Sequence, residues 1–225
     1  MSSGRQAIVA GGTGLIGGFL LRHLVADPRY ARVVALTRRP LDDIASPKLE
    51  NLVTDFDALE QSLANKDLTV DDAYCALGTT IKIAGSQAAF RKVDHDYILA
   101  FAKAAKARGA KRFLLVSAIG ADAKSQIFYS RVKGETEQAI DALGFDALHV
   151  FRPGMLIGSR AEKRPVEEIG AVVAPFFNAL MLGPARPYRS IPAETVAAAM
   201  VAAAWNDIPG RQIHTYDEME RLAGV

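Results

Sequence analysis

The sequence is poor in the residues that build disulfides and metal sites. It has one cysteine, Cys75, among 225 residues, so no internal disulfide can form, and we expect this residue to be a small buried side chain. The four histidines lack metal-ligand spacing, and no metal site is expected. The G-x-S-x-G pattern of many hydrolases and the G-K-[ST] pattern of phosphate loops are also absent. Hydrolase, kinase and metalloenzyme functions therefore receive little support.

The chain also lacks an excess of charge of either sign. It carries 27 lysine and arginine residues against 25 aspartate and glutamate residues, a formal net charge of +2, and the basic residues are spread out. This balance gives no reason to expect a nucleic-acid partner. Half of the residues are hydrophobic, so a chain of this length can form one domain with a substantial core.

Long hydrophobic runs are absent as well. The longest lipid-compatible run, residues 171–182, has twelve residues and contains a proline and an asparagine, which is too short to span a bilayer. Residues 1–6 are mostly polar and show no signal-peptide pattern. We therefore expect no integral membrane segment and a cytoplasmic location.

Glycine, by contrast, is concentrated near the start of the chain. Five glycines occupy residues 11–18, between an apolar run at residues 7–10 and an apolar-periodic segment that begins at Leu15. This order predicts a strand, a tight turn and a helix start, where backbone N–H groups approach a pyrophosphate closely. An ordinary glycine-rich turn is the alternative, but the strand before and the helix after favour a dinucleotide site. We expect the site to include Gly11, Thr13, Gly14, Leu15, Ile16 and Gly17.

Two glycine spacings overlap in this turn. Gly12, Gly14 and Gly17 satisfy G-x-G-x-x-G, whereas Gly11, Gly14 and Gly17 satisfy the wider G-x-x-G-x-x-G. The wider form is typical of short-chain dehydrogenase/reductases, so the turn hints at that superfamily. The spacing alone leaves open which glycine plays which role.

Strand-like and helix-like segments alternate along most of the chain. Repeated β-α-β units predict a doubly wound, Rossmann-type parallel sheet with helices on both faces, in a single domain over residues 1–225. Beyond Pro153 the alternation breaks down, and we expect residues 154–190 to form a small substrate cap. The last clear element is a helix at residues 193–205. The other expected strands are 7–10, 32–37, 49–54, 73–77, 112–117 and 147–152, and the other expected helices are 15–26, 57–64, 87–108 and 130–143.

Tyr129 and Lys133 carry the mechanistic argument. Their spacing of four places both side chains on one face of a helix. A neighbouring ammonium stabilises a phenolate and makes a tyrosine a usable proton donor and acceptor near neutral pH. Ser117, at the end of the fifth expected strand, could hydrogen-bond a substrate oxygen as charge develops there. A half-buried tyrosine beside a surface lysine is the alternative, but the glycine turn and the serine favour a catalytic set.

Together these motifs resemble an atypical short-chain dehydrogenase/reductase. More narrowly, the order of segments is similar to the HIV Tat-interacting oxidoreductase family and its bacterial relatives, from Ile8 to about His214. The segments that carry the resemblance are Leu36-Thr37-Arg38-Arg39-Pro40, Asp55-Phe56, Cys75-Ala76-Leu77-Gly78-Thr79-Thr80, Val93-Asp94-His95-Asp96-Tyr97, residues 129–135 and Phe151-Arg152-Pro153-Gly154.

The resemblance implies further cofactor contacts. Asp55 is similar to an acidic residue that contacts the adenine, and Leu156 is placed to flank the nicotinamide. Arg164 is implied to reach the cofactor, with a surface charge on the cap as the alternative. The loop after the fourth strand is implied to lie under the cofactor ribose through Leu77, Gly78 and Thr79.

The sequence departs from the superfamily pattern in two places. Ala118 and Ile119 follow Ser117 where many extended relatives carry a second hydroxyl residue, so Ser117 is less firmly assigned than Tyr129. Ordinary short-chain dehydrogenases place an asparagine of a proton relay on the long helix. Here that helix offers Asp94, His95 and Asp96, which we expect on the helix surface without a catalytic role.

The end of the second strand favours NADP(H) as the cofactor. A site that prefers NAD usually ends this strand with an acidic residue that accepts from the ribose hydroxyls. Here the corresponding place holds Arg38 and Arg39, and two guanidiniums suit a 2′-phosphate. A solvated arginine pair in a loop is the alternative.

The leading hypothesis is an NADP(H)-dependent oxidoreductase that transfers hydride to or from a small carbonyl or alcohol. The apolar stretch within residues 172–182 favours an apolar substrate, although core packing or a dimer contact also explains such a stretch. Two alternatives stay open: a sugar-nucleotide epimerase or dehydratase, and a non-catalytic NADP(H)-binding redox sensor that regulates a partner. A homodimer or a protein partner is compatible with each of them.

Overall fold

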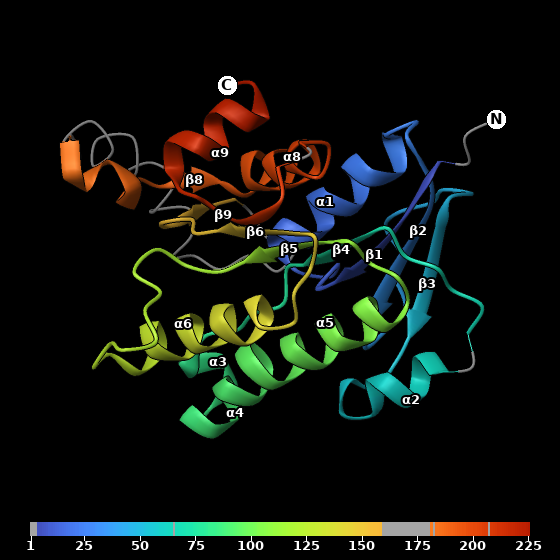
Figure 1. Cartoon of the computed structure of the whole chain (residues 1–225), viewed down its shortest axis with the longest axis horizontal. Coiled ribbons are helices and arrows are strands. Elements are labelled where there is room, and N and C mark those ends of the chain that lie inside the picture. Colours follow the sequence, from blue (N-terminus) through green and yellow to red (C-terminus); the bar gives the residue numbers. More distant parts are fainter. Residues whose placement is uncertain (1–3, 65, 159–180, 182, 207) are drawn as a thin grey trace.

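The computed structural model describes residues 4–64, 66–158, 181, 183–206 and 208–225. At its centre lies a sheet of seven parallel strands in the order β3-β2-β1-β4-β5-β6-β9 (Figure 1). The order reverses between β1 and β4, and open α/β sheets bind ligands outside the carboxyl ends of their strands at such a point. The expected Rossmann-type sheet is confirmed. Its strands are β1 (Arg5–Ala10), β2 (Tyr30–Thr37), β3 (Leu49–Val53), β4 (Asp72–Cys75), β5 (Arg112–Val116), β6 (Ala147–Phe151) and β9 (Gly210–His214).

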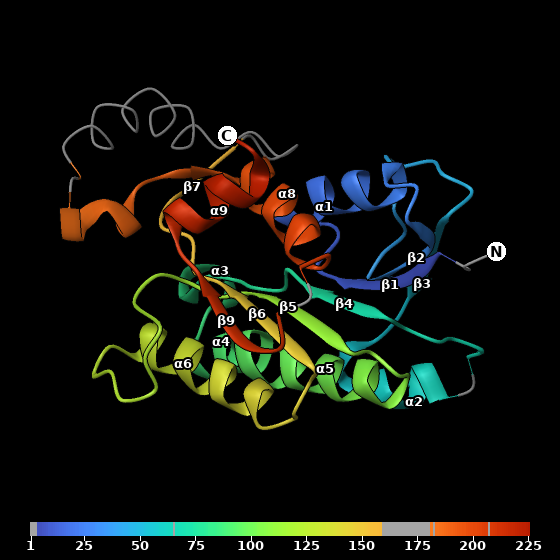
Figure 2. The ribbon, with the colours of Figure 1, turned by 45° about the horizontal axis from the view of Figure 1, so that its top comes forward.

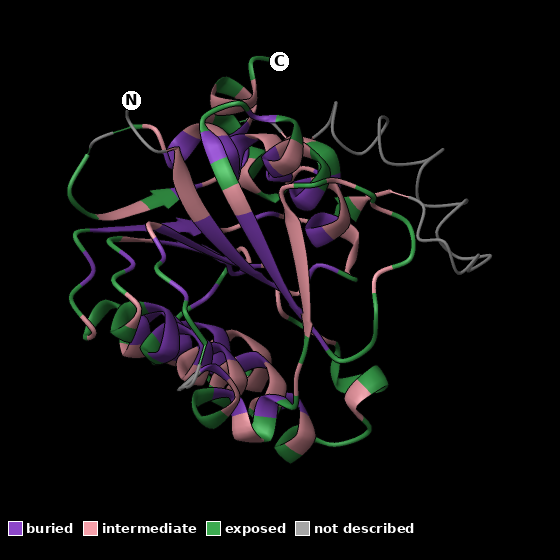
Figure 3. Cartoon of the chain, turned by 90° about the vertical axis from the view of Figure 1, so that its right-hand side faces the viewer, coloured by how far each residue is buried: buried purple, intermediate pink, exposed green. Residues whose placement is uncertain are grey.

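Helices cover both faces of the sheet (Figure 2). One face carries α1 (Leu15–Ala26), α8 (Ala193–Ala203) and α9 (Tyr216–Ala223). The opposite face carries α2 (Leu59–Ala64), α4 (Gln87–Arg91), α5 (Tyr97–Ala107) and α6 (Phe128–Asp141). Each layer encloses its own apolar cluster, and the central strands between them are buried along most of their length (Figure 3). Burial on both faces explains why these strands are short continuous apolar runs.

Helix α1 shows how the local sequence determines the buried side and the end of a helix. Leu20, Leu21 and Leu24 fall on one side of α1 and are fully buried against the sheet. The helix ends at Ala26, and Pro28 follows two residues later, where its ring cannot continue a helix. The observed bounds of α1 match the sequence prediction for residues 15–26.

The long helix expected at residues 87–108 contains a π-helical turn, η2 (Lys92–Asp96), between α4 and α5. A π-turn adds one residue to the helical repeat and so rotates the face that follows it. The three- and four-residue spacing of apolar residues in this helix predicts one face toward the sheet, made of Phe90, Val93, Tyr97, Phe101 and Ala105. Phe90, Phe101 and Ala105 are fully buried as predicted. Val93 and Tyr97 are only half-buried, whereas Asp94 and Ile98 are fully buried. Gly109 follows the helix with φ +92°, as predicted for a residue just past a helix end.

The C-terminal part holds elements that the sequence did not predict. A two-stranded sheet pairs β7 (Leu156–Ile157) with β8 (Ile191–Pro192), and η3 (Gly183–Tyr188) lies between them in the chain. Strand β9 was missed because it is an edge strand of mixed polarity, GRQIH. Helix α9 begins with a capping box between Thr215 and Glu218, a signal that was present in the sequence. The expected cap at residues 154–190 falls largely outside the described residues and stays a prediction.

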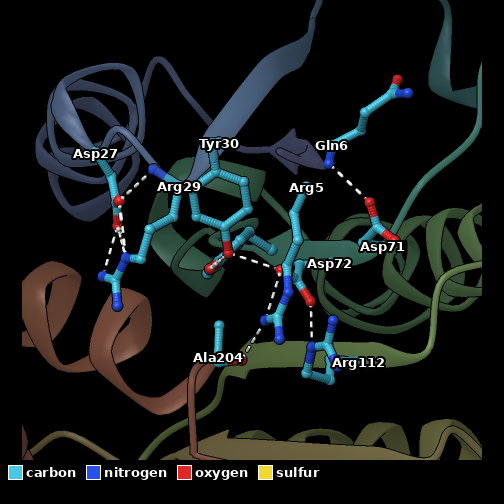
Figure 4. Close-up of polar contacts among 10 residues, drawn as sticks. Arg5, Gln6, Asp27, Arg29, Tyr30, Asp71, Asp72, Arg112 and Ala204 are labelled. Atoms are coloured by element: carbon cyan, nitrogen blue, oxygen red, sulfur yellow. Dashed lines mark hydrogen bonds and ion pairs between the residues drawn. The ribbon is translucent and has the colours of Figure 1, made fainter. Parts of the chain in front are cut away.

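A buried polar cluster joins the amino ends of four strands (Figure 4). Tyr30 Oη donates to Asp72 Oδ2 at 2.7 Å, and Arg112 donates to the other oxygen of the same carboxylate. Arg5 lies 3.5 Å from Asp72 and stacks over the Trp205 ring. These residues open β1, β2, β4 and β5, so the cluster holds the sheet together at the edge opposite the carboxyl ends.

Candidate functional site

The glycine loop connects β1 to α1 at the carboxyl edge of the sheet. Gly11 has φ +90°, and a Cβ there would lie 2.5 Å from the carbonyl of Ala76 at the end of β4. A Cβ on Gly17 would overlap the carbonyl oxygen of Gly11, and the Gly14 N–H donates to that same oxygen at 2.9 Å. Gly11 and Gly17 therefore have to be glycine for the loop to close, which agrees with the wider of the two spacings.

The start of α1 is open at the end of this loop. Gly14 is the N-cap residue and supplies no side-chain hydrogen bond to the first turn, which contains Leu15, Ile16 and Gly17. Thr13 is exposed beside them. Free N–H groups at a helix start, with the positive end of the helix dipole, favour an anion. The loop can therefore hold a phosphate group.

Two exposed arginines follow β2, the neighbour of β1. Within the described part of the chain, neither Arg38 nor Arg39 has a hydrogen bond or an ion pair. Thr37, just before them, is buried and accepts from Asn51 at 2.7 Å, so the strand end that carries the arginines is held in place. Asp55 is exposed after β3 and accepts from the Asp57 N–H at 2.9 Å, at the start of η1 (Phe56–Ala58).

Tyr129 and Lys133 lie one turn apart on α6. The Tyr129 ring is half-buried and packs against Phe90, with 5.4 Å between ring centroids. Lys133 is 5% exposed, and its Nζ lies 2.7 Å from Oδ1 of Asp94. Burial alone lowers the pKa of a lysine, but the charge of Asp94, aided by Tyr129, outweighs this effect and raises the pKa of Lys133. Lys133 is therefore held as a cation.

The predicted surface position of Asp94 is wrong. Its side chain is fully buried, where it meets Lys133 of α6 and the loop after β4. Oδ2 of Asp94 accepts from the Thr79 N–H at 2.8 Å. Asp96 is exposed as predicted, and its carboxylate lies 2.7 Å from Nδ1 of the half-buried His95. Asp94 lies four residues after the buried Phe90, so helical spacing alone allowed an inward position, but its polar side chain favoured the surface.

The loop after β4 passes close to this ion pair. Leu77 and Thr79 are half-buried, and Gly78 is exposed. A Cβ on Gly78 would lie 3.4 Å from Asp94 Oδ1 and 3.7 Å from Lys133 Nζ, so the backbone runs directly over the pair. The structure thus brings the predicted ribose loop and Lys133 together.

Ser117 lies just past the end of β5 and is 5% exposed. Its hydroxyl donates to Oε1 of Glu137 at 2.5 Å. Glu137 is fully buried and also accepts from Arg152 at 2.6 and 3.0 Å and from Arg211 at 2.6 Å. Sequence reasoning missed Glu137, although its position four residues after Lys133 places it on the same face of α6.

The remaining predicted contacts are less enclosed. Leu156 lies in β7 and is 36% exposed. Arg164 lies outside the described residues.

Burial raises the pKa of the Cys75 thiol to about 12, so this cysteine is a packing residue. Among the described residues, no group of three or more His, Cys, Asp or Glu side chains could hold a metal ion.

Sequence comparison identifies relatives over most of the chain. A family model described as NAD(P)H-binding matches residues 11–207. Protein HTATIP2 of Rattus norvegicus is 37% identical over 199 residues, covering 88% of this chain and 80% of the relative. Protein fmp52 of Emericella nidulans is 40% identical over 168 residues, covering 73% of this chain and 72% of the relative.

Solved structures share the fold at low sequence identity. MoeE5 in complex with UDP-glucose and NAD is 17% identical with a TM-score of 0.67, covering 97% of this chain and 82% of that chain. The human epimerase family protein SDR39U1 with NADPH is 20% identical with a TM-score of 0.62, covering 93% of this chain and 74% of that chain. One of these structures holds NAD and the other NADPH, so the likeness supports the fold and does not select a cofactor.

The comparisons correct the expected location. The fmp52 protein of Emericella nidulans is named a mitochondrial protein, as is its counterpart in Saccharomyces cerevisiae. The expectation of a cytoplasmic location is therefore wrong, because it relied on the absence of a leader pattern, which does not determine where a protein resides. No helix within the described ranges is long and apolar enough to cross a membrane.

Proposed function

This chain belongs to the NAD(P)H-binding family, among the atypical short-chain dehydrogenase/reductases related to HTATIP2 and FMP52, and we propose that it is an NADP(H)-dependent oxidoreductase. It transfers hydride to or from a small, apolar carbonyl or alcohol. The observation that carries the proposal is that Tyr129 and the buried Lys133, which is ion-paired with Asp94, lie one turn apart on α6, at the same edge of the sheet as the glycine loop.

The glycine loop supports binding of the cofactor pyrophosphate. Gly11 and Gly17 leave no room for side chains, so the backbone itself forms the surface beside the open start of α1. Backbone N–H groups at this position hold the two phosphates of a dinucleotide in the Rossmann fold. Exposed Thr13 and the first-turn residues Leu15 and Ile16 complete this contact in the proposal.

In this proposal, contacts to the adenosine end of the cofactor give the preference for NADP(H). Arg38 and Arg39 are exposed, unpaired within the described part of the chain, and carried by a strand end that Thr37 anchors. Two guanidiniums can grip a 2′-phosphate with charge-assisted hydrogen bonds. Asp55, exposed after β3, is proposed to contact the adenine.

The nicotinamide, when bound, supplies or accepts the hydride, and the residues of the chain handle the proton. Lys133 is held as a cation by Asp94 and binds the ribose hydroxyls beside the loop at Gly78. Its ammonium lies one helical turn from Tyr129, on the same side of α6. Tyr129 Oη then donates a proton to the substrate oxygen during reduction and accepts one during oxidation.

Apolar side chains at the carboxyl edge support an apolar substrate. Ile81 and Ile83 are exposed in α3 (Ile81–Ala84), after β4, and Ile127 is 67% exposed just before Tyr129. Met155 and Leu156 are exposed after β6. Single exposed apolar residues are common, but here five lie in the segments that follow β4, β5 and β6.

The test is a screen of apolar aldehydes, ketones and quinones with NADPH, run in parallel on wild type and Tyr129→Phe. We expect wild type to oxidise NADPH with at least one carbonyl and Tyr129→Phe to lose roughly 100-fold or more in turnover, because general acid catalysis contributes on that scale. Both proteins should bind NADPH equally. Full activity in Tyr129→Phe would contradict the assignment.

The same experiment distinguishes the alternative functions. Tight NADPH binding without turnover of any carbonyl would favour a redox sensor that regulates a partner. Tightly retained NAD that does not exchange would favour an epimerase. A homodimer or a protein partner stays a prediction.

A further inference from the structure

Asp94 connects three separate parts of the candidate site. Its Oδ1 lies 2.7 Å from Lys133 Nζ, and its Oδ2 accepts from the Thr79 N–H at 2.8 Å. Its backbone carbonyl accepts from Thr136 Oγ1 at 2.8 Å. The side chains of Asp94, Lys133 and Thr136 are all buried, so these contacts are shielded from water. One residue therefore links α6, the loop after β4 and the long helix.

Asp94 lies within the π-helical turn η2 (Lys92–Asp96) of the long helix. Such turns are rare, are less favourable than a regular helix and occur often at functional sites. Asp94 lies four residues after Phe90 and four before Ile98, so the three side chains share one side of the helix, and all three are fully buried. The chain thus brings a carboxylate into its interior at an irregular turn of the helix.

Stability alone does not account for this arrangement. A buried ion pair loses the hydration of both charges, and apolar residues of similar volume are often at least as stabilising. The groups that face Lys133 are Asp94 on η2, Tyr129 on its own helix and Cys75 on β4. Burial keeps the Cys75 thiol neutral, so Asp94 is the group that keeps Lys133 charged.

We propose that Asp94 is a positioning residue. It holds Lys133 protonated and directed at the cofactor ribose, and it fixes the backbone of Thr79 beside Lys133. This role rests on the proposed function, since it assigns the ribose to Lys133 and the loop after β4. Asp94 touches neither substrate nor cofactor in this proposal and acts through Lys133 and Thr79.

The test compares Asp94→Asn with the matched control Asp96→Asn, which removes an exposed carboxylate two residues away on the same turn. Asparagine can still accept from the Thr79 N–H but carries no charge. We expect Asp94→Asn to weaken NADPH binding by about tenfold at pH 7, because Lys133 loses the charge that holds it in place and its charged hydrogen bond to the ribose is weakened. As the pH is raised, NADPH binding by Asp94→Asn should also begin to decline at a lower pH than NADPH binding by wild type. Asp96→Asn should behave as wild type.

A second measurement does not depend on the cofactor. The Lys133 Cε resonance of ¹³C-lysine-labelled protein, assigned with Lys133→Arg, reports the protonation of Lys133 directly. In wild type it should titrate above pH 10.5, the ordinary lysine value, and in Asp94→Asn it should titrate at a lower pH. A Lys133 that titrates below 10.5 in wild type overturns the inference, even if Asp94→Asn does not fold. Absence of NADPH binding by wild type, with the Lys133 titration as expected, would overturn only the proposed function.

Discussion

The hydroxyl of Ser117 donates its hydrogen to the buried carboxylate of Glu137 at 2.5 Å. Glu137 also accepts from Arg152 and Arg211, so it ties α6 to the ends of β5 and β6 and to β9. A serine that gives its hydrogen to a carboxylate can offer only lone pairs to another partner. The substrate-orienting role of Ser117 stays a prediction, and in this arrangement Tyr129 is the proton donor to the substrate oxygen.

Ser117→Ala separates a structural role from a catalytic one. We expect the free energy of unfolding to fall by about 1–3 kcal/mol, since Glu137 loses one buried partner. We expect turnover to fall less than about tenfold, because Tyr129 and Lys133 are intact. Urea unfolding and steady-state kinetics measure the two effects. A loss of turnover as large as that of Tyr129→Phe, with unchanged stability, would show that the hydroxyl contacts the substrate.

Arg38→Ala/Arg39→Ala tests the cofactor preference. Each guanidinium that binds the 2′-phosphate contributes a charged hydrogen bond, so we expect the Kd for NADPH to rise by roughly 10- to 100-fold. The Kd for NADH, which lacks this phosphate, should be unchanged. Fluorescence titration of both cofactors gives the ratio, with Arg22→Ala as a control for the loss of an exposed arginine on α1. Equal affinities for NADPH and NADH in wild type would contradict the preference.

Gly17→Ala and Gly18→Ala form a matched pair in the first turns of α1. A methyl group on Gly17 would overlap the Gly11 carbonyl, whereas one on Gly18 would come no closer than 3.9 Å to the Gly12 carbonyl. We expect Gly17→Ala to lose NADPH binding and about 1–3 kcal/mol of stability. Gly18→Ala should bind NADPH normally and gain about 0.5–1 kcal/mol of stability, because glycine is less favourable than alanine inside a helix. Isothermal titration and thermal unfolding report both quantities, and equal behaviour of the two variants would show that the loop does not close as described.

His149 and His214 form a buried pair that predicts loss of stability in mild acid. Nδ1 of His149 lies 3.0 Å from Nε2 of His214. Burial, with the charges of His214 and Arg112, lowers the pKa of His149 to about 4. Burial also lowers the pKa of His214, although Glu218 opposes the shift. Between about pH 6.5 and 4 the unfolded chain therefore binds more protons than the folded one, and stability falls as pH falls.

His149→Gln measures this contribution. Glutamine retains hydrogen-bonding capacity but does not titrate, so the decline in unfolding free energy between pH 6.5 and 4 should be smaller by up to about 3 kcal/mol than in wild type. Urea unfolding of both proteins across this range, in the same buffers, separates the contribution of the histidine to the unfolding free energy from that of the carboxylates. Parallel curves would show that the pair does not contribute to acid sensitivity.

Local sequence was sufficient for the alternation of strands and helices, the glycine loop and the Tyr129–Lys133 pair. Each depends on interactions within a few residues. The left-handed backbone of Gly11 requires glycine, the leucines of α1 repeat at helical spacing, and a separation of four aligns Tyr129 with Lys133. These features follow from sterics and periodicity, and the structure reproduces them with small changes at the ends of elements.

Tertiary packing decided the rest. Asp94 is polar, so the sequence close to it favoured the surface, and its partners on α6 and after β4 account for its buried position. Glu137 tolerates burial because Ser117, Arg152 and Arg211 converge on it from segments up to 74 residues away. Strand β9 has too few apolar residues to be found alone and is held by pairing with β6. A buried charge or an edge strand depends on distant partners, and the sequence close to it does not reveal where they are.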